Sequence, residues 1–377
     1  MAGKKQVLVV GGYGKVGSCV SGILSDYKEL YPYIAGRNVN KAEALSEKLR
    51  CGFCKVDIED KDSVEAALEN MDIVISCYTN PGNISTILPE EAIKQGVHYM
   101  DLSGHSKYNN KIIALDSEAR KNNVTLITGL GLYPGLIGLL LSDNRNYFEK
   151  IGSTEIFFVS GGNWEGVSEL SLCEIGHMME ETPLIYNGRK WVAADSKGKN
   201  EYIGEPFNKK IFLYPGMITN DVLKIPENMS YNKIAMWSGS ETFLQGMVLY
   251  FGVKRGYTEI LEKLGRFLKV LRFLGRNKNK HSLVKIVTTG SCDNIKHERV
   301  VEFNAPEQIL TALAPVLVCE QIARGDIDQP GAFTPPDVVD VKILFDSFKE
   351  KDINYRESIK KFQILPGLKP GESLSSE

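Results

Sequence analysis

The first 130 residues alternate short apolar runs with segments of helical spacing. Unbroken apolar runs, such as VLVV at residues 7–10 and IVI at 73–75, are typical of strands buried on both faces of a sheet. Apolar residues at helical spacing follow these runs, for example over residues 15–27 and 61–71. We therefore predict an α/β chain in which six strands alternate with five helices and form a doubly wound parallel sheet.

The pattern changes after about residue 150. Longer strand-like runs predict a mixed or antiparallel sheet in a second domain, with helical patterns at 167–181 and 258–274. The predicted strands lie at residues 154–162, 190–195, 208–214, 231–241, 283–292 and 297–305. Another helix begins near Pro306, and the tail is rich in Gly, Pro and Ser.

A glycine motif opens the first predicted helix. Gly12, Gly14 and Gly17 form GxGxxG directly after the first strand. Glycines at this spacing allow a tight turn, close approach of a pyrophosphate to the backbone, and close contact between helix and strand. The helix N-terminus then favours the negative charge of the pyrophosphate. The motif predicts a dinucleotide site, to which Tyr13, Lys15 and Val16 also contribute.

The second strand ends in Gly36, Arg37 and Asn38, where NAD-binding chains usually carry an acidic residue. A guanidinium binds a 2′-phosphate through two hydrogen bonds, whereas a carboxylate repels it. We therefore predict NADP(H) as the cofactor, with Gly36 leaving room for the phosphate. Asp57 either accepts from the adenine amine or caps its own turn. The remaining predicted cofactor contacts follow the fourth strand and are Ser76, Cys77 and Tyr78.

Composition narrows the partners to small molecules. The chain has 377 residues, 43% of them hydrophobic, which is enough for a large core and two domains. Its formal net charge of -2 lacks the basic excess of nucleic-acid binders. No apolar run reaches the roughly 18–20 residues of a membrane helix. The basic amphipathic pattern at 258–274 favours an outer helix that covers a sheet over a membrane-surface helix.

The seven cysteines are scattered, which suits a reducing cytoplasm. Cys51 and Cys54 form CxxC, but the motif leads into a strand rather than opening a helix that would activate a thiol. A zinc site needs a second pair, and none follows at suitable spacing. We predict a structural role for both cysteines and no metal site.

Four further stretches make the chain resemble a known family. They read DIVISCY (72–78), EEAIKQGVHYMDLSG (90–104), ARKNNVTLITGLGLYPGLIGLLL (119–141) and TALAPVLVCEQIARGDIDQPGAFTPPD (311–337). In order and spacing they resemble the saccharopine dehydrogenase-like family, in its glutamate-forming branch, with carboxynorspermidine and lysine dehydrogenases among the relatives. The resemblance covers most of residues 5–140 and 306–340.

The resemblance implies a Rossmann domain that the C-terminal segment completes, with an inserted α+β mixed-sheet domain. In this family the insert binds substrate and often forms the dimer interface, so the resemblance implies a homodimer. The expected division is residues 1–135 for the dinucleotide-binding domain, 136–305 for the insert, 306–366 for the return to the Rossmann domain, and 367–377 for a loose tail.

The resemblance also implies hydride transfer between a nicotinamide and a C–N bond, with substrate between the domains. The chain departs from the family at three positions. Tyr133 replaces an acidic residue in the DPG turn, Ser160 replaces a cysteine, and Met236 stands near an expected arginine. These departures favour a less anionic imine than saccharopine.

Two residues are the predicted catalytic groups. Asp101 ends the fifth strand, at the sheet edge where ligands bind, and would stabilise an iminium or cap a turn. Tyr133 lies in the crossing between domains and would contact substrate or pack as a wall. Predicted substrate contacts lie beside them and on the second domain: Ser103, His105, Tyr108, Ser160, Gly161 and Trp164.

Together these features predict a cytoplasmic, NADPH-dependent oxidoreductase that reduces an imine or forms a secondary amine by reductive condensation. Amino-acid, polyamine or specialised metabolism is the expected setting. One alternative is an oxidative amine or amino-acid dehydrogenase. Another, of a different class, is a non-catalytic NADP-binding sensor on the same fold.

Overall fold

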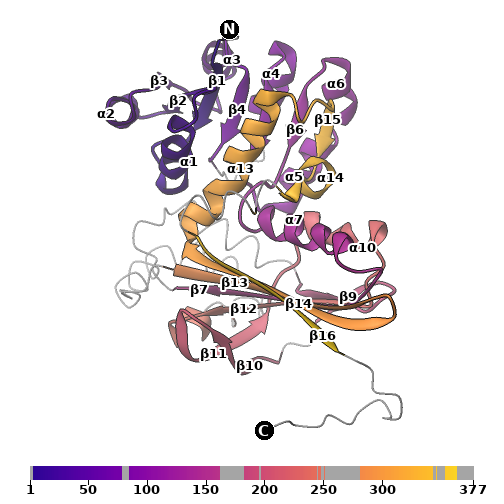
Figure 1. Cartoon of the computed structure of the whole chain (residues 1–377). Helices are drawn as coiled ribbons and strands as arrows, with labels where there is room; N and C mark the ends of the chain where they lie inside the picture. Colours follow the sequence, from indigo (N-terminus) through magenta and orange to yellow (C-terminus); the bar gives the residue numbers. More distant parts are fainter. Residues whose placement is uncertain are drawn as a thin grey trace, which may run out of the picture.

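Two β-sheets, stacked along the length of the molecule, organise the chain in a computed structural model (Figure 1). The structure describes residues 3–78, 85–161, 182–194, 197–243, 245–247, 250, 281–342, 345 and 353–362. Helix α7 (Leu136–Ser142) lies between the two sheets, and α13 (Glu307–Arg324) runs from the second sheet along one face of the first.

The first sheet is parallel and has the strand order β15-β6-β5-β4-β1-β2-β3. Its strands are β1 (Lys5–Val10), β2 (Leu30–Gly36), β3 (Gly52–Lys55), β4 (Ile73–Ser76), β5 (His98–Asp101), β6 (Thr125–Ile127) and β15 (Gly331–Phe333). Chain order runs outward from β1 on both sides. The edge beside the carboxyl ends of β1 and β4 is therefore the switch point where such sheets bind ligands.

Helices cover both faces of this sheet. Packed on one face are α3 (Lys61–Leu68), α4 (Ile87–Gln95), α5 (Ser106–Ile113) and α6 (Asp116–Lys121), which share a core with Leu8, Val10 and Tyr99. On the other face α1 (Lys15–Ser25) packs beside α13. Helix α2 (Val39–Leu49) packs beside β2 and β3.

The second sheet is mixed, with the main strand order β10-β11-β12-β7-β13-β14-β16. Its strands are β7 (Lys150–Ser160), β8 (Leu184–Tyr186), β9 (Trp191–Ala193), β10 (Lys199–Gly204), β11 (Phe207–Pro215), β12 (Lys233–Ser240), β13 (His281–Cys292), β14 (Ile295–Pro306) and β16 (Asn354–Phe362). The short helices η1 (Asp143–Asn146), α9 (Asn220–Leu223), α10 (Ile225–Asn228) and α14 (Pro335–Val338) complete the described elements.

One continuous apolar core runs from the first sheet through α7 and α13 to the second sheet. It joins Val9 and Ile75 of the first sheet with Ile156 and Phe303 of the second. A helix that is apolar all round is expected to be buried, as α7 is over its whole length. The two sheets are therefore packed together by hydrophobic contact.

The predicted fold class, a Rossmann-like parallel sheet plus a separate mixed sheet, is confirmed. The last of the five helices predicted from the sequence, over residues 110–123, is instead two helices, α5 and α6, which meet at Ala114 and Leu115. Strand β16 was not predicted, and it pairs with β14 in the second sheet although it lies within the expected return segment 306–366. The domain boundaries stay a prediction. The helical patterns at 167–181 and 258–274 and the tail lie outside the described residues.

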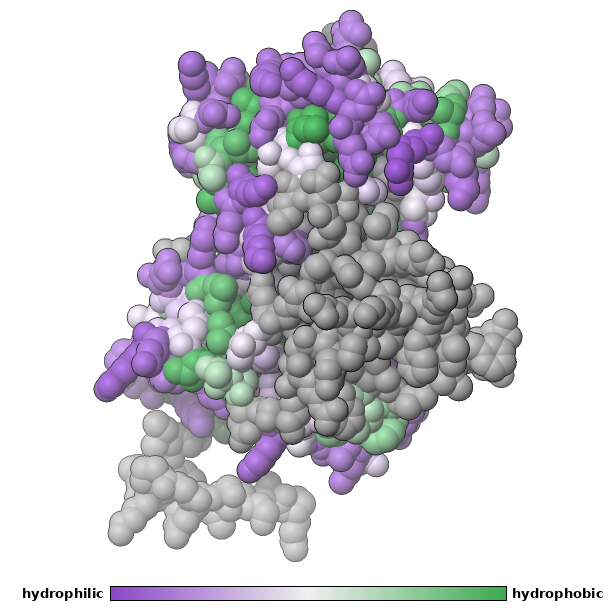
Figure 2. All heavy atoms as spheres, turned by 180° about the vertical axis from the view of Figure 1, so that it is seen from behind, coloured by the Kyte–Doolittle hydropathy of each residue, from purple (hydrophilic) through white to green (hydrophobic). Residues whose placement is uncertain are grey.

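The described surface is mostly hydrophilic on the face seen in Figure 2, with smaller hydrophobic areas. Large hydrophobic side chains are exposed at Phe53, Tyr202, Phe243, Ile295, Ile359 and Phe362. Among the described helices, none combines the length and apolar character needed to cross a membrane.

Candidate cofactor and active site

The glycine turn after β1 is built so tightly that side chains are excluded. A Cβ on Gly17 would lie 2.2 Å from the carbonyl oxygen of Gly11, and a Cβ on Gly12 would lie 2.7 Å from that of Val9. The amide of Gly14 donates to the Gly11 oxygen at 2.8 Å. Gly11, which the motif does not include, has φ +74° and supplies the reversal that most residues avoid.

Helix α1 begins at this turn with its N-terminus open to an anion. Its N-cap is Gly14, which provides no side-chain cap, and its first turn contains no acidic residue. The backbone amides of a first helical turn attract negative charge through their own dipoles and through the helix dipole. The geometry therefore fits the pyrophosphate of a dinucleotide, and Gly12, Gly14, Lys15, Val16 and Gly17 would hold it.

The adenosine end of the predicted site is organised by Tyr13. Its ring lies over Gly36, since a Cβ there would meet Tyr13 atoms at 2.6 to 2.9 Å, and its hydroxyl accepts the amide of Asn38 at 3.1 Å. The expectation that Gly36 leaves open room for a phosphate is therefore corrected, because the tyrosine ring fills that space. Arg37 is exposed just beyond β2, where its guanidinium stays accessible to a ligand.

The ends of β3 and β4 approach the same edge of the sheet. Burial raises the pKa of Tyr78, and the nearby charges of Arg37, Glu59 and Asp57 modify it. Asp57 accepts the amide of Glu59 at 3.2 Å, so it caps its own turn, which was one of its two predicted roles.

Ser76 and Cys77 line the inner part of this edge. Ser76 is buried and donates to the carbonyl of Tyr78 at 3.4 Å. The Cys77 backbone lies against Gly11, because a Cβ on that glycine would be 3.3 Å from it. Burial raises the pKa of the Cys77 thiol to about 12, so this cysteine is not a thiolate at neutral pH.

Asp101 is a buried carboxylate with one oxygen engaged. Its Oδ1 accepts the amides of Ser103 at 2.9 Å and Gly129 at 3.2 Å, so it caps two turns. Its Oδ2 has no hydrogen-bond partner among the described residues. The hydroxyls of Thr128 and Tyr99 lie close enough to favour the charged form, but burial dominates and raises the pKa to about 6.

We expect the Asp101→Asn variant to gain stability relative to the native chain as pH rises. The carboxyl has an ordinary pKa of 3.8 and a folded pKa of about 6. The folded state therefore holds its proton more tightly, and the native chain loses stability between about pH 4 and pH 6. Urea unfolding from pH 4 to 8 should show a relative gain of up to about 3 kcal/mol. A difference in unfolding free energy between the two proteins that stays constant over this pH range would contradict the raised pKa of the buried carboxyl group.

Three predicted substrate contacts form a local network beside Asp101. Ser103 accepts the amide of His105 at 3.2 Å, and the ring of His105 accepts the amide of Tyr108 at 3.3 Å as the N-cap of α5. The hydroxyl of Tyr108 lies 2.7 Å from that of Tyr99. These contacts give the segment a structural role, and they bring in Tyr99, which lies on the same face of β5 as Asp101. The period of two along the strand is the signal that would have identified it.

Tyr133 lies in the loop that Asp101 helps to hold. Besides Gly129, the amide of Leu130 donates to the Asp101 carbonyl at 2.7 Å. The Tyr133 ring packs against the core between the two sheets, whereas Tyr99 belongs to the core on the opposite face of the first sheet. Asp101 therefore contacts the loop of Tyr133 from β5, and the two predicted catalytic side chains have different surroundings.

The second sheet contributes the end of β7. Ser160 ends this strand, and the amide of Gly161 donates to Ser282 at 3.4 Å. Ser282 in turn donates to Glu307 at 3.2 Å, at the start of α13. Sequence reasoning missed Glu307. Burial raises the pKa of its carboxyl group, and the positive charge of the nearby Lys15 offsets part of this increase. Ser160 and Gly161 thus lie within a chain of contacts that leads toward the glycine turn. Trp164 lies outside the described residues.

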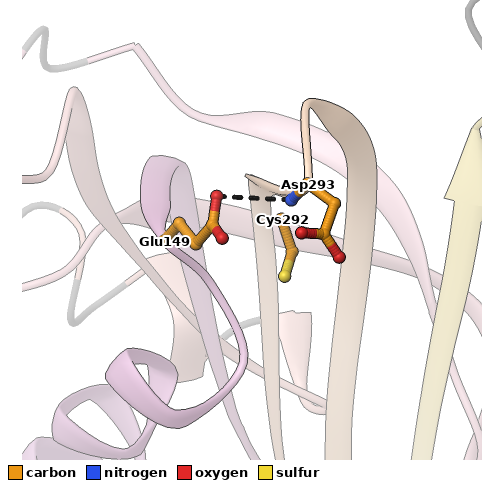
Figure 3. A group of neighbouring side chains, drawn as sticks. All are labelled: Glu149, Cys292 and Asp293. Atoms are coloured by element: carbon orange, nitrogen blue, oxygen red, sulfur yellow. Dashed lines mark hydrogen bonds between the residues drawn. The ribbon is translucent and has the colours of Figure 1, made fainter.

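Two groups of side chains carry atoms of the kinds that bind metal ions. Cys51 and Cys54 are free thiols, and burial raises the pKa of each, to about 11 for Cys54. Glu149, Cys292 and Asp293 bring ligand atoms within 4.8 Å of one another at the turn between β13 and β14 (Figure 3). Glu149 accepts the Asp293 amide at 3.3 Å, so the exposed group is explained as a cap of that turn.

Comparison with known proteins agrees with this geometry. Residues 7–127 match the family described as the saccharopine dehydrogenase NADP binding domain. The predicted resemblance and the predicted cofactor class, NADP(H), are thereby confirmed. The matched region runs from β1 to β6, the part of the chain that carries the glycine turn, Arg37 and Asp101.

Two solved structures share the fold over nearly the whole chain. The L-Glu-forming saccharopine dehydrogenase from Saccharomyces cerevisiae is 14% identical with a TM-score of 0.68, over 94% of this chain and 100% of that one. A homospermidine synthase from Legionella pneumophila, solved with NAD, is 11% identical with a TM-score of 0.63, over 99% and 95%. At these identities the likeness is one of fold.

Proposed function

We propose that the protein is an NADPH-dependent oxidoreductase that acts on a C–N bond, by reducing an imine or by forming a secondary amine through reductive condensation. The observation that carries the proposal is the side-chain-free turn that opens α1, together with the exposed Arg37 at the end of β2. The match of residues 7–127 to the saccharopine dehydrogenase NADP binding domain supports the same reaction class.

Bound NADPH would supply the hydride. The protein's own groups bind and orient: the glycine turn takes the pyrophosphate, and Arg37 binds the 2′-phosphate that distinguishes NADPH from NADH. Asp101 contributes buried negative charge close to the carboxyl ends of β4 and β5, which favours a cationic iminium. Tyr133 would contact the substrate from the loop that Asp101 holds. We also keep the homodimer and the cytoplasmic location as predictions.

An oxidative amine dehydrogenase is the first alternative. Such an enzyme would run the same hydride transfer in reverse, and preference for NAD over NADP would favour it. A non-catalytic NADP sensor is the second alternative. It would bind NADPH without turnover of any imine.

A fluorescence titration with NADPH and with NADH at equal salt tests the proposal. Losing charged hydrogen bonds to a 2′-phosphate costs about 1.5–3 kcal/mol, so NADPH should bind at least about tenfold more tightly. The Arg37→Gln variant should lose most of this preference through weaker NADPH binding, with NADH affinity unchanged. Arg189→Gln, at an exposed arginine in the turn between β8 and β9, is the matched control and should keep the native ratio.

The outcomes separate the alternatives. A native preference for NADPH that Arg37→Gln abolishes supports the proposed cofactor site, and screening of imines and keto acid–amine pairs with NADPH then tests turnover. Equal or tighter NADH binding would make Arg37 a surface residue and place the oxidative dehydrogenase first. Failure to bind either nucleotide would contradict the proposed function and leave the fold alone.

A further inference from the structure

The loop that carries Tyr133 is held by a carboxylate at each end. At its start, Asp101 accepts the amide of Gly129 at 3.2 Å. At its end, Asp221 accepts the amide of Gly135 at 2.9 Å. Asp101 belongs to the first sheet, whereas Asp221 lies on α9, in the segment that joins β11 to β12 of the second sheet. Both parts of the chain therefore determine the conformation of this loop.

The Asp221 carboxylate is buried and fits closely against α7. The residue is 2% exposed, and Thr219 donates to its other carboxylate oxygen at 2.6 Å. On α7, Gly138 leaves the space that the carboxylate occupies, because a Cβ there would lie 2.3 Å from Asp221 Oδ2. Gly135 has φ +116°, a conformation that favours glycine. A buried carboxylate in so close a fit is costly unless its hydrogen bonds are satisfied, and here they are.

The neighbouring residue extends the contact to the other predicted site segment. Asn220 donates to the carbonyl of Ser106 at 3.3 Å and to the side chain of Asn110 at 3.1 Å, both on α5. Helix α5 begins directly after His105, in the network that Asp101 supports. Helix α9 therefore contacts the two segments that flank Asp101.

We propose that Asp221 is a positioning residue, which acts from the second sheet's domain to fix the loop of Tyr133 relative to Asp101. The proposal rests on the proposed function only in that Tyr133 is the group expected to contact substrate there. Its geometric content, that the Asp221–Gly135 hydrogen bond sets the place of the Tyr133 ring, holds for the folded protein with or without turnover.

The decisive experiment reports on Tyr133 without any substrate. 3-Fluorotyrosine is placed at position 133 of the full chain, and its ¹⁹F resonance is recorded in the native background and in the Asp221→Ala and Asp221→Asn backgrounds. We expect Asp221→Ala to move the resonance by more than its linewidth or to split it. Asp221→Asn keeps an oxygen of the same reach and should restore the native signal, because the Gly135 amide still has an acceptor.

A matched control separates positioning from general stability. Asp116 also accepts a backbone amide, that of Ala332 at 2.9 Å, on β15 where Ala332 pairs with Leu126 of β6. Asp116→Ala should lower the melting temperature and leave the Tyr133 resonance unchanged. If Asp221→Ala does not fold, Gly138→Ala disturbs the same carboxylate from α7 and should displace the resonance. A native resonance in a folded Asp221→Ala or Gly138→Ala variant would overturn the proposal.

Turnover gives a second measurement with 1-pyrroline and NADPH as the probe. Misplacement by about 1 Å costs on the order of 10²-fold in rate, so Asp221→Ala should lower kcat by that order while NADPH affinity stays native. Adding Tyr133→Phe should cause no further loss, since residues that act through one another are not additive. If the free-energy effects of Asp221→Ala and Tyr133→Phe on kcat add up in the double variant, the proposed coupling of the two residues is contradicted. If NADPH does not bind, the proposed function is contradicted but the positioning role of Asp221 is not, because the fluorine signal reports the position of the loop independently.

Discussion

The Arg299→Ala variant is expected to lose about 3–5 kcal/mol of unfolding free energy, the largest effect of any single substitution considered. Arg299 is 1% exposed on β14. Its guanidinium pairs with Asp143 at 2.6 Å and with Glu357 at 2.7 Å. It also lies 3.5 Å from the ring centroid of Tyr147. Truncation would leave the carboxylate of Asp143, itself 3% exposed, buried without its cation.

The location of this arginine explains why its loss should be felt widely. Asp143 and Asn144 lie in η1, directly after α7, and Glu357 lies on β16, so one side chain joins three segments. Urea unfolding of the variant measures the loss. Lys296→Ala, at an exposed lysine of the same strand, is the control and should change stability by less than about 0.5 kcal/mol.

A double substitution distinguishes the cost of an unpaired charge from the worth of the pair. Replacing a buried ion pair by apolar residues of similar volume is often nearly neutral, whereas removing one partner is not. Arg299→Met combined with Asp143→Leu should therefore recover part of the stability lost in Arg299→Ala. A loss below about 1 kcal/mol in Arg299→Ala would contradict the buried, uncompensated charge.

The same cluster shows where sequence reasoning ends. Hydrophobic spacing located β1 to β6 of the first sheet and β7, β9, β11, β12, β13 and β14 of the second, because each buries a face whose pattern repeats locally, but it missed β8, β10 and β15. Arg299 pairs with Asp143, 156 residues earlier, and with Glu357, 58 residues later. No local pattern marks such a pair. Strand β16 was missed for a related reason, since eight of its nine residues are exposed and it lacks the apolar alternation of a half-buried strand.

In the candidate site too, local sequence patterns predicted some residues, and only the fold reveals others. The glycine turn and Arg37 were predictable because phosphate binding requires particular residues at fixed spacing after a strand. Asp101 was located by its place at the end of β5, but one of its two cap contacts is with Gly129, 28 residues away. Asp221 meets Gly135 across 86 residues and two sheets, so only the fold reveals it. His105 caps α5 in the structure, and its predicted contact with substrate stays a prediction.

Gly17→Ala is expected to weaken NADPH binding by at least about 100-fold, or close to 3 kcal/mol. A Cβ at this position would lie 2.2 Å from the Gly11 oxygen and 2.8 Å from the Gly12 Cα, both backbone atoms that cannot rotate away. The methyl group must therefore push α1 away from the turn. The amides that should meet the pyrophosphate move with the helix, so binding is lost even though no ligand contact is removed directly.

The same helix supplies the matched control. Gly22 lies one and a half turns further along α1, and a Cβ there would meet nothing within 4 Å. Gly22→Ala should keep native NADPH affinity and raise stability by about 0.5–1 kcal/mol, because alanine is the better helix former. Fluorescence titration and thermal melting of both variants measure the two effects. Native NADPH affinity in a folded Gly17→Ala variant would mean that the cofactor does not use the N-terminus of α1, and the pyrophosphate would have to bind elsewhere along the carboxyl edge of the first sheet.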